Sequence, residues 1–264
     1  MQVYVFKTEQ DVDTYVGQQI STFIQDNDAP VIGFATGSTP LGAYDYLIDS
    51  YQSGKTDFSK VRAFNLDEYV GIEKDHPQSF ARAMKDYLFS KINIKEENIY
   101  SLNGNAKDMT KECKEYDQLI INNPIDIQIL GIGMDGHIAY NEPGSSFDSE
   151  SHVVDLHPES IQSSLDYGFT KIEDVPTQGV TQGIKTIMKA RQLIMIAKGN
   201  KKAKLVERML YGPVSEDFPS SIIQTHNNVI VVLDQCAAAN LKEETYEKAL
   251  KSLQLEEAAV ILQN

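Results

Sequence analysis

Cysteine, basic residues and long apolar runs are scarce in this 264-residue sequence. The two cysteines, Cys113 and Cys236, lie far apart and form no C-x-x-C pair, so we expect reduced structural thiols in a cytoplasmic protein. No apolar run is long enough to cross a bilayer, and the first residues lack the charged-then-apolar pattern of a signal peptide. We therefore expect neither a membrane span nor a targeting segment.

The shortage of basic residues limits the partners. Lysine and arginine number 24 against 38 acidic residues, which gives a net charge of −14. Because nucleic-acid backbones are bound by clustered lysine and arginine, this balance argues against nucleic acid as a partner. A small anionic ligand is still compatible, provided that a local device such as a helix N-terminus binds it.

What the sequence does contain is a regular alternation of strand and helix patterns. Short β-branched runs predict strands, and the segments between them have helical spacing. This pattern indicates an α/β fold, with one domain over 1–264 and a mostly parallel, doubly wound sheet covered by helices on both faces. The region 141–180 is less regular and is either a long active-site loop or a helical lid over about 145–180. The expected strands are 2–6, 30–35, 61–66, 125–132, 192–197 and 228–233, and the expected helices are 9–25, 40–52, 78–91, 108–121, 179–190, 200–211 and 241–253.

Polar segments follow four of these strands, and parallel strands would bring them to one edge of the sheet, where ligands bind in such folds. The segment "ATGSTP" (35–40) combines a turn glycine, Gly37, with the hydroxyls of Ser38 and Thr39 at the start of a helix. Free N–H groups there would make an anion site, although an ordinary capped helix start has the same pattern. "NLDEYVG" (65–71) places Asp67 after a strand as a potential general base, or as part of a solvated acidic turn.

The segment "LGIGMDGHIAYNEPGSSF" (130–147) contains G-x-G-x-x-G, but it does not match the dinucleotide fingerprint. That fingerprint needs a helix directly after the glycines, and Pro143 and Gly144 interrupt any such helix. The alternative is a catalytic loop in which Asp135 and Glu142 orient His137 and raise its basicity. A structural histidine is the simpler alternative, and a metal site is disfavoured because the other histidines show no ligand spacing.

The segment "KGNKKAKL" (198–205) opens the next helix with four lysines. In so acidic a chain, lysines after a strand are candidates for a phosphate contact, and a solvated helix face is the alternative.

Taken together, these loops resemble the glucosamine-6-phosphate deaminase family. The matching elements are "ATGSTP", "FNLDEYVG", "HPQSF", "LGIGMDGHIAYNEPGSSF", "VPTQGVTQGI" and the lysine loop, in order over most of the chain. The resemblance implies a fold related to ribose-5-phosphate isomerase. It also implies conversion of glucosamine 6-phosphate and water to fructose 6-phosphate and ammonia, with no cofactor and no catalytic metal.

The resemblance also implies roles for individual residues. Asp67 would move the C2 proton to C1, and His137, oriented by Asp135 and Glu142, would assist opening of the sugar ring. The phosphate would be held by Thr36, Gly37, Ser38, Thr39 and Lys202.

Three alternatives stay open at this point. Galactosamine 6-phosphate differs at a single stereocentre. The 6-phosphogluconolactonases resemble the chain at the S-T-P loop and the D-G-H motif, but they typically continue with a T-A-S-L-F-P-type run in place of N-E-P-G. A non-catalytic sugar-phosphate sensor would not need all of Asp67, Asp135, His137 and Glu142.

Two departures from the family pattern are visible. In the family resemblance, a phosphate-binding arginine falls at the position of Asp166, and no arginine occurs between Arg82 and Arg191. Loss of a bidentate phosphate clamp and gain of a carboxylate should weaken phosphate binding unless another group, such as Lys171, substitutes. The alternatives are a different substrate or an altered catalytic role. The basic residues that regulated hexameric members carry after the N-E-P loop are replaced by "SHVVDL". We therefore expect no amino-sugar effector site and a monomer or small homo-oligomer.

Overall fold

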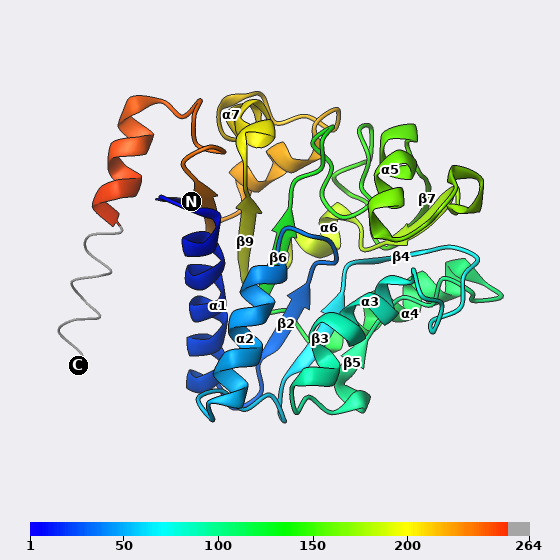
Figure 1. Ribbon diagram of the computed structural model, residues 1–264. Coiled ribbons are helices and arrows are strands. Elements are labelled where there is room, and N and C mark those ends of the chain that lie inside the picture. The colour runs from blue at the N-terminus through cyan, green and yellow to red at the C-terminus, as the bar shows by residue number, and fades with distance from the viewer. Residues whose placement is uncertain (253–264) are drawn as a thin grey trace.

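The computed structural model describes residues 1–252, and for Asp166 and Tyr167 it describes the backbone alone. Its centre is a seven-stranded sheet in the order β1-β10-β9-β6-β2-β3-β5, in which every neighbouring pair is parallel. Figure 1 shows β9, β6, β2 and β3 side by side. The strands are β1 (Gln2–Phe6), β2 (Val31–Phe34), β3 (Arg62–Asn65), β5 (Ile99–Tyr100), β6 (Ile127–Gly131), β9 (Gln192–Ala197) and β10 (Val229–Asp234).

The predicted strands are confirmed to within one or two residues at each end, and so is the mostly parallel sheet. Every residue of β2 and of β10 is buried. Successive side chains of a strand point to opposite faces, so both faces of the sheet are covered. β5, with two residues, was not predicted because so short a strand leaves no periodic signal.

Most of the predicted helices are also found. α1 begins with a capping box in which Thr8 and Asp11 exchange hydrogen bonds. α1 and α2 lie side by side (Figure 1), and a Cβ at Gly17 would come within 2.6 Å of Tyr46, so the two helices need a glycine where they meet. The longer helices are α1 (Glu9–Asp26), α2 (Leu41–Gln52), α3 (Phe80–Tyr87), α4 (Met109–Asn122) and α7 (Ala203–Tyr211).

Residues 243–252 are helical as well, so the helix expected at 241–253 is found over the described residues, and its last position lies outside them. None of the described helices has the length and apolar character that a membrane span requires. The two cysteines are free, Cys113 buried and Cys236 exposed.

One helix prediction is wrong. The first residues of the segment 179–190 belong to β8 (Gln178–Thr181), and the helix that follows, α6 (Ile184–Ile187), has only four residues. β8 lies between β4 (Asp67–Tyr69) and β7 (His152–Asp155) in a small antiparallel sheet, where Asp67 pairs with Thr181. Pairing with strands far away in sequence overrides the local helical spacing here.

The irregular region 141–180 contains β7, the six-residue helix α5 (Pro158–Ser163), short 3₁₀ turns and most of β8. A second apolar cluster fastens it to the rest of the protein. Tyr69 and Phe80 meet Phe169 and Leu156 in this cluster, together with Tyr140 and Val175. Figure 1 shows α5 and β7 together on the side of β4.

Candidate active site

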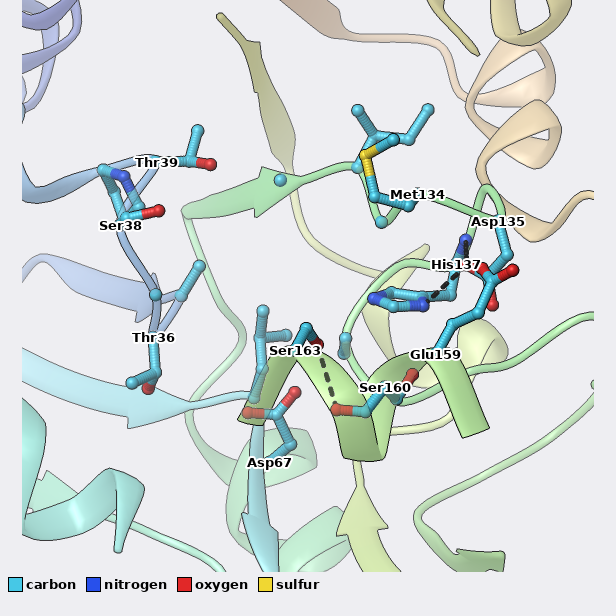
Figure 2. Close-up of a pocket in the computed structure, with 18 of the residues that line it drawn as sticks. Thr36, Ser38, Thr39, Asp67, Met134, Asp135, His137, Glu159, Ser160 and Ser163 are labelled. Carbon is cyan, nitrogen blue, oxygen red and sulfur yellow. Dashed lines mark hydrogen bonds and ion pairs between the residues drawn. The ribbon is translucent and has the colours of Figure 1, made fainter. Parts of the chain in front are cut away.

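A cavity of about 320 Å³ lies at the carboxyl ends of the parallel strands. The segments that follow β2, β3, β6 and β9 all contribute to its wall, and α5 supplies a further part (Figure 2). The cavity is lined by Ala35, Thr36, Gly37, Ser38, Thr39, Pro40, Leu66, Asp67, Gly131, Ile132, Gly133, Met134, Asp135, His137, Ala139, Glu159, Ser160, Ser163 and Lys202. Of the nine residues to which the resemblance assigns catalytic or phosphate-binding roles, eight line this cavity, and the ninth, Glu142, contacts His137.

The loop after β2 forms one side of the cavity. Gly37 adopts φ of 122°, a conformation that favours glycine. A capped helix start was the alternative to an anion site here, but Pro40 occupies the cap position of α2 and no side chain caps the helix. The first-turn N–H groups are thus left without a side-chain acceptor, and the Thr36 hydroxyl is buried without a partner. Both features suit an anionic group bound from the cavity.

Asp67 enters the cavity from the start of β4, directly after β3 and Leu66. Its side chain is nearly buried, with 7% of the residue exposed. Burial, together with the negative charge of the neighbouring Glu68, raises the pKa of Asp67 to about 7, although the charge of His137 opposes the rise. A carboxylate with this pKa is a stronger base than an ordinary aspartate, and it is available at neutral pH.

Glu68 does not line the cavity, and its carboxylate is held by the backbone. Its Oε1 accepts from the N–H groups of Tyr69 and Phe80, and its Oε2 accepts from that of Ala81, each at 2.9 Å. Burial raises the pKa of Glu68, and these three donors act in the opposite direction. Glu68 therefore ties the start of α3 to β4 next to Asp67.

The loop after β6 holds the second acid–base group. Nδ1 of His137 lies 2.7 Å from Oδ1 of Asp135 and 3.3 Å from Oε2 of Glu142. Asp135 Oδ1 also accepts from the backbone N–H of His137 at 3.1 Å. Burial alone would lower the pKa of His137, but the two carboxylates outweigh it and raise the pKa to about 9. His137 is thus an imidazolium at neutral pH, able to give a proton to a group in the cavity.

Gly133 makes room for this imidazole. A Cβ at Gly133 would come within 2.3 Å of Cε1 and Nε2 of His137, so any other residue would displace the ring. These glycines therefore let the loop backbone turn and lie close to neighbouring side chains, and they do not form a dinucleotide-binding loop. Gly136, at φ of 94°, lies equally close to Phe218.

The donors of Asp135, His137 and Glu142 lie within 4.8 Å of one another, close enough to be considered as a metal site. The 2.7 Å separation of His137 Nδ1 from Asp135 Oδ1 is an ion-pair distance, but Nδ1 lacks the alignment of a hydrogen bond to either carboxylate. Because the pKa of His137 is about 9, the ring is charged, and we interpret the set as an ion-paired acid–base group.

Lys202 is the one lysine or arginine among the described side chains that line the cavity. Its Nζ donates to the carbonyl of Ile132 at 2.7 Å, and burial lowers its pKa while Asp135 opposes this effect. Lys198, from the same lysine loop, forms a nearly buried ion pair with Asp13 at 2.9 Å instead. Lys171 is exposed and does not line the cavity, and the side chain of Asp166 lies outside the described part of the chain.

The sequence did not identify the contribution of α5. Glu159, Ser160 and Ser163 line the cavity from this helix, and Figure 2 shows all three on α5. Serines in an irregular segment carry no signature of their own. Only the expectation of an active-site loop or a helical lid in the region 141–180 pointed to this part of the chain.

These features define an α/β protein with acid–base groups and an anion-binding loop around a small polar cavity. The model of the glucosamine-6-phosphate isomerase and 6-phosphogluconolactonase family matches residues 7–232. The chain belongs to this family.

Relatives within the family are close. The glucosamine-6-phosphate deaminase of Oceanobacillus iheyensis is 39% identical over 95% of this chain and all of its own length. That of Clostridium novyi is 42% identical over 91% of this chain and all of its own.

Solved structures agree with this placement. A monomeric glucosamine-6-phosphate deaminase, 38% identical, superposes with a TM-score of 0.89 over 91% of this chain and all of its own. The 6-phosphogluconolactonase of Thermotoga maritima, 20% identical, superposes with a TM-score of 0.70 over 88% of this chain and 99% of its own, which shows a shared fold alone.

Proposed function

We propose that the protein converts glucosamine 6-phosphate and water to fructose 6-phosphate and ammonia. The observation that carries the proposal is the placement of two differently tuned acid–base groups, Asp67 and the His137 ion pair, around one cavity that also contains an uncapped helix start. An aldose-to-ketose conversion needs one group at the ring oxygen and another at C2, and the phosphate must be held away from both.

The proposed reaction begins with ring opening. His137, protonated at neutral pH, gives a proton to the ring oxygen, and the O1 hydroxyl returns one as the C1 carbonyl forms. Asp135 and Glu142 stabilise the imidazolium and fix its orientation. The C2 proton then becomes acidic, because it lies beside a carbonyl.

Asp67 takes the C2 proton while His137 returns a proton to O1, which gives an enolamine with its double bond between C1 and C2. Asp67 then delivers its proton to C1, which leaves a C2 iminium. The C2 iminium adds water and releases ammonia, leaving the C2 ketone of fructose 6-phosphate. Binding of the phosphate by Thr36, Gly37, Ser38, Thr39 and Lys202 would hold C1 and C2 between the two groups. The hydroxyl of Thr36, buried without a partner, supports this assignment.

Galactosamine 6-phosphate, 6-phosphogluconolactone and a non-catalytic sensor are the competing possibilities. The "NEPG" glutamate favours the deaminase over the lactonase, because Glu142 lies against His137, and a sensor has no need of a buried base such as Asp67. We also propose a monomeric or small homo-oligomeric, cytoplasmic protein. The monomeric deaminase with the same fold supports the first part.

The test is ammonia release from glucosamine 6-phosphate, with fructose 6-phosphate measured in a coupled assay. Equal amounts of both products are expected, and Asp67→Asn should abolish them while the substrate still raises the melting temperature. Full turnover by Asp67→Asn would remove Asp67 from the mechanism. If millimolar glucosamine 6-phosphate is not consumed, the deaminase proposal fails, and the galactosamine ester and the lactone are the next substrates.

A further inference from the structure

Glu142 connects α5 to the histidine at the far side of the cavity. One of its oxygens, Oε2, lies 3.3 Å from Nδ1 of His137. The other, Oε1, accepts from the hydroxyl of Ser160 at 2.6 Å and from the backbone N–H of His157 at 3.3 Å. The Glu142 side chain is only 5% exposed, so it depends on these protein donors in place of water.

We propose that Ser160 is a positioning residue, whose hydroxyl holds Glu142 against His137 and thereby makes the charge of His137 depend on the placement of α5. The proposal rests on the proposed function only for its catalytic consequence. Of the two donors that reach Oε1, the Ser160 hydroxyl is the closer, and both belong to the segment 157–160. Displacement of this segment would remove both of them from the carboxylate.

A second set of hydrogen bonds fixes Ser160 from the opposite side. The Tyr69 hydroxyl donates to Ser164 Oγ at 2.7 Å, and the Ser164 hydroxyl donates to the carbonyl of Ser160 at 2.9 Å. Tyr69 is the last residue of β4, the strand that begins with Asp67. The chain of contacts therefore runs from the strand of Asp67, through α5 and Glu142, to His137.

The charges around His137 determine what loss of the Ser160 hydroxyl would do. From its own loop, Asp135 and Glu142 lie at Nδ1. Asp67 of β4, Lys202 and Glu159 of α5 line the same cavity. Without the Ser160 hydroxyl, Asp135 still contacts Nδ1, but Glu142 keeps only the longer hydrogen bond from the His157 N–H and is held less firmly against His137. The pKa of His137 should then fall below about 9, without reaching the value of an unpaired histidine.

The experiment is an NMR titration of the His137 imidazole in the substrate-free protein, with selectively labelled histidine. Ser160→Ala should lower the midpoint by about one pH unit, the size expected for weakening one of two ion pairs. Ser163→Ala is the matched control. Ser163 is on the same helix and lines the same cavity, but its hydroxyl donates to the Ser160 carbonyl and not to Glu142, so the midpoint should stay at the wild-type value.

The proposal is overturned if Ser160→Ala leaves the midpoint unchanged, or if Ser163→Ala moves it equally. Ser160→Thr keeps a hydroxyl and should retain the wild-type midpoint. Should Ser160→Ala fail to fold, Ser160→Cys fills the same space with a weaker donor, and the midpoint must still fall.

Steady-state kinetics test the catalytic consequence of the proposal separately. With glucosamine 6-phosphate, Ser160→Ala should reduce kcat about tenfold and change KM less than about twofold, because the phosphate-binding loop is untouched. Equal kcat values for Ser160→Ala and wild type would contradict the catalytic consequence. Absence of turnover in the wild type would refute the proposed function, while the titration would still decide the role of Ser160.

Discussion

The imidazole of His137 lies directly against the backbone of Gly133, where a Cβ would come within 2.3 Å of two ring atoms. Gly133 also donates its N–H to the carbonyl of His137 at 3.0 Å, so the loop closes on itself around this contact. The position of the His137 ring therefore depends on a residue that has no side chain.

Gly133→Ala should displace the imidazole and lower kcat/KM for the deamination about 100-fold, the typical contribution of a positioned acid–base group. The change should also move the NMR signals of His137. Gly131→Ala is the matched control, because a Cβ there would meet only Thr39, at an ordinary 3.9 Å. The Gly131→Ala protein should keep the wild-type melting temperature and His137 signals, and an undisturbed His137 in Gly133→Ala would contradict the steric argument.

The central sheet could be predicted from the sequence because its strands are continuous β-branched runs buried on both faces. The loops that follow these strands could also be predicted to meet, because the carboxyl ends of parallel strands lie at one edge of the sheet. The small antiparallel sheet was missed because β4, β7 and β8 have three or four residues each and pair across long stretches of sequence. The contact of Ser160 with Glu142 depends on where that sheet places α5, so no local pattern could have indicated it.

The pH dependence of kcat/KM should be bell-shaped. Asp67 must be ionised to act as a base, which gives an acidic limb near its pKa of about 7. His137 must be protonated to act as an acid, which gives an alkaline limb near its pKa of about 9. In His137→Gln, the residual activity should lose the alkaline limb and keep an acidic one, moved to higher pH because the charge of His137 no longer lowers the pKa of Asp67. An alkaline limb that survives in this variant belongs to another group.

Asp67 should reduce the stability of the folded protein at neutral and alkaline pH. Its pKa is about 7 in the folded state against an ordinary 3.8, so the folded protein binds the proton more tightly than the unfolded chain. The free energy of unfolding therefore falls as pH rises from about 4 to 7, by about 4 kcal/mol for this group.

Asp67→Asn removes this effect, so the variant should be more stable than wild type at pH 8 and about equal to it at pH 4.5. Urea unfolding at the two pH values measures the difference. Asp28→Asn also removes one negative charge, from a fully exposed side chain, and should leave the free energy of unfolding unchanged at both. A gain for Asp67→Asn of the same size at both pH values would rule out the ionisation of Asp67 as its cause.

Glu68→Gln should shift the acidic limb of kcat/KM below pH 7. After burial, the negative charge of Glu68 is the main cause of the raised pKa of Asp67, and the amide removes that charge. The amide also offers one oxygen to the three N–H groups that Glu68 accepts from, which should cost about 1–3 kcal/mol of stability. If stability falls and the acidic limb does not move, Glu68 acts on the fold and not on Asp67.

Position 166 tests whether the phosphate site is complete. Its backbone lies in the 3₁₀ turn Ser164–Tyr167, directly after α5, and the family pattern has an arginine there. Lys202 is the cation that lines the cavity among the described side chains, so a guanidinium that reaches the cavity from position 166 should add a bidentate phosphate contact. Asp166→Arg should therefore lower KM for glucosamine 6-phosphate about tenfold, with little change in kcat.

Asp166→Ala is the control that separates the loss of the carboxylate from the gain of a guanidinium, since it removes the carboxylate without adding a cation. An equal fall in KM for both variants would mean that repulsion by Asp166 is the whole effect, and an unchanged KM in both would mean that the loop after β2 and Lys202 already hold the phosphate fully.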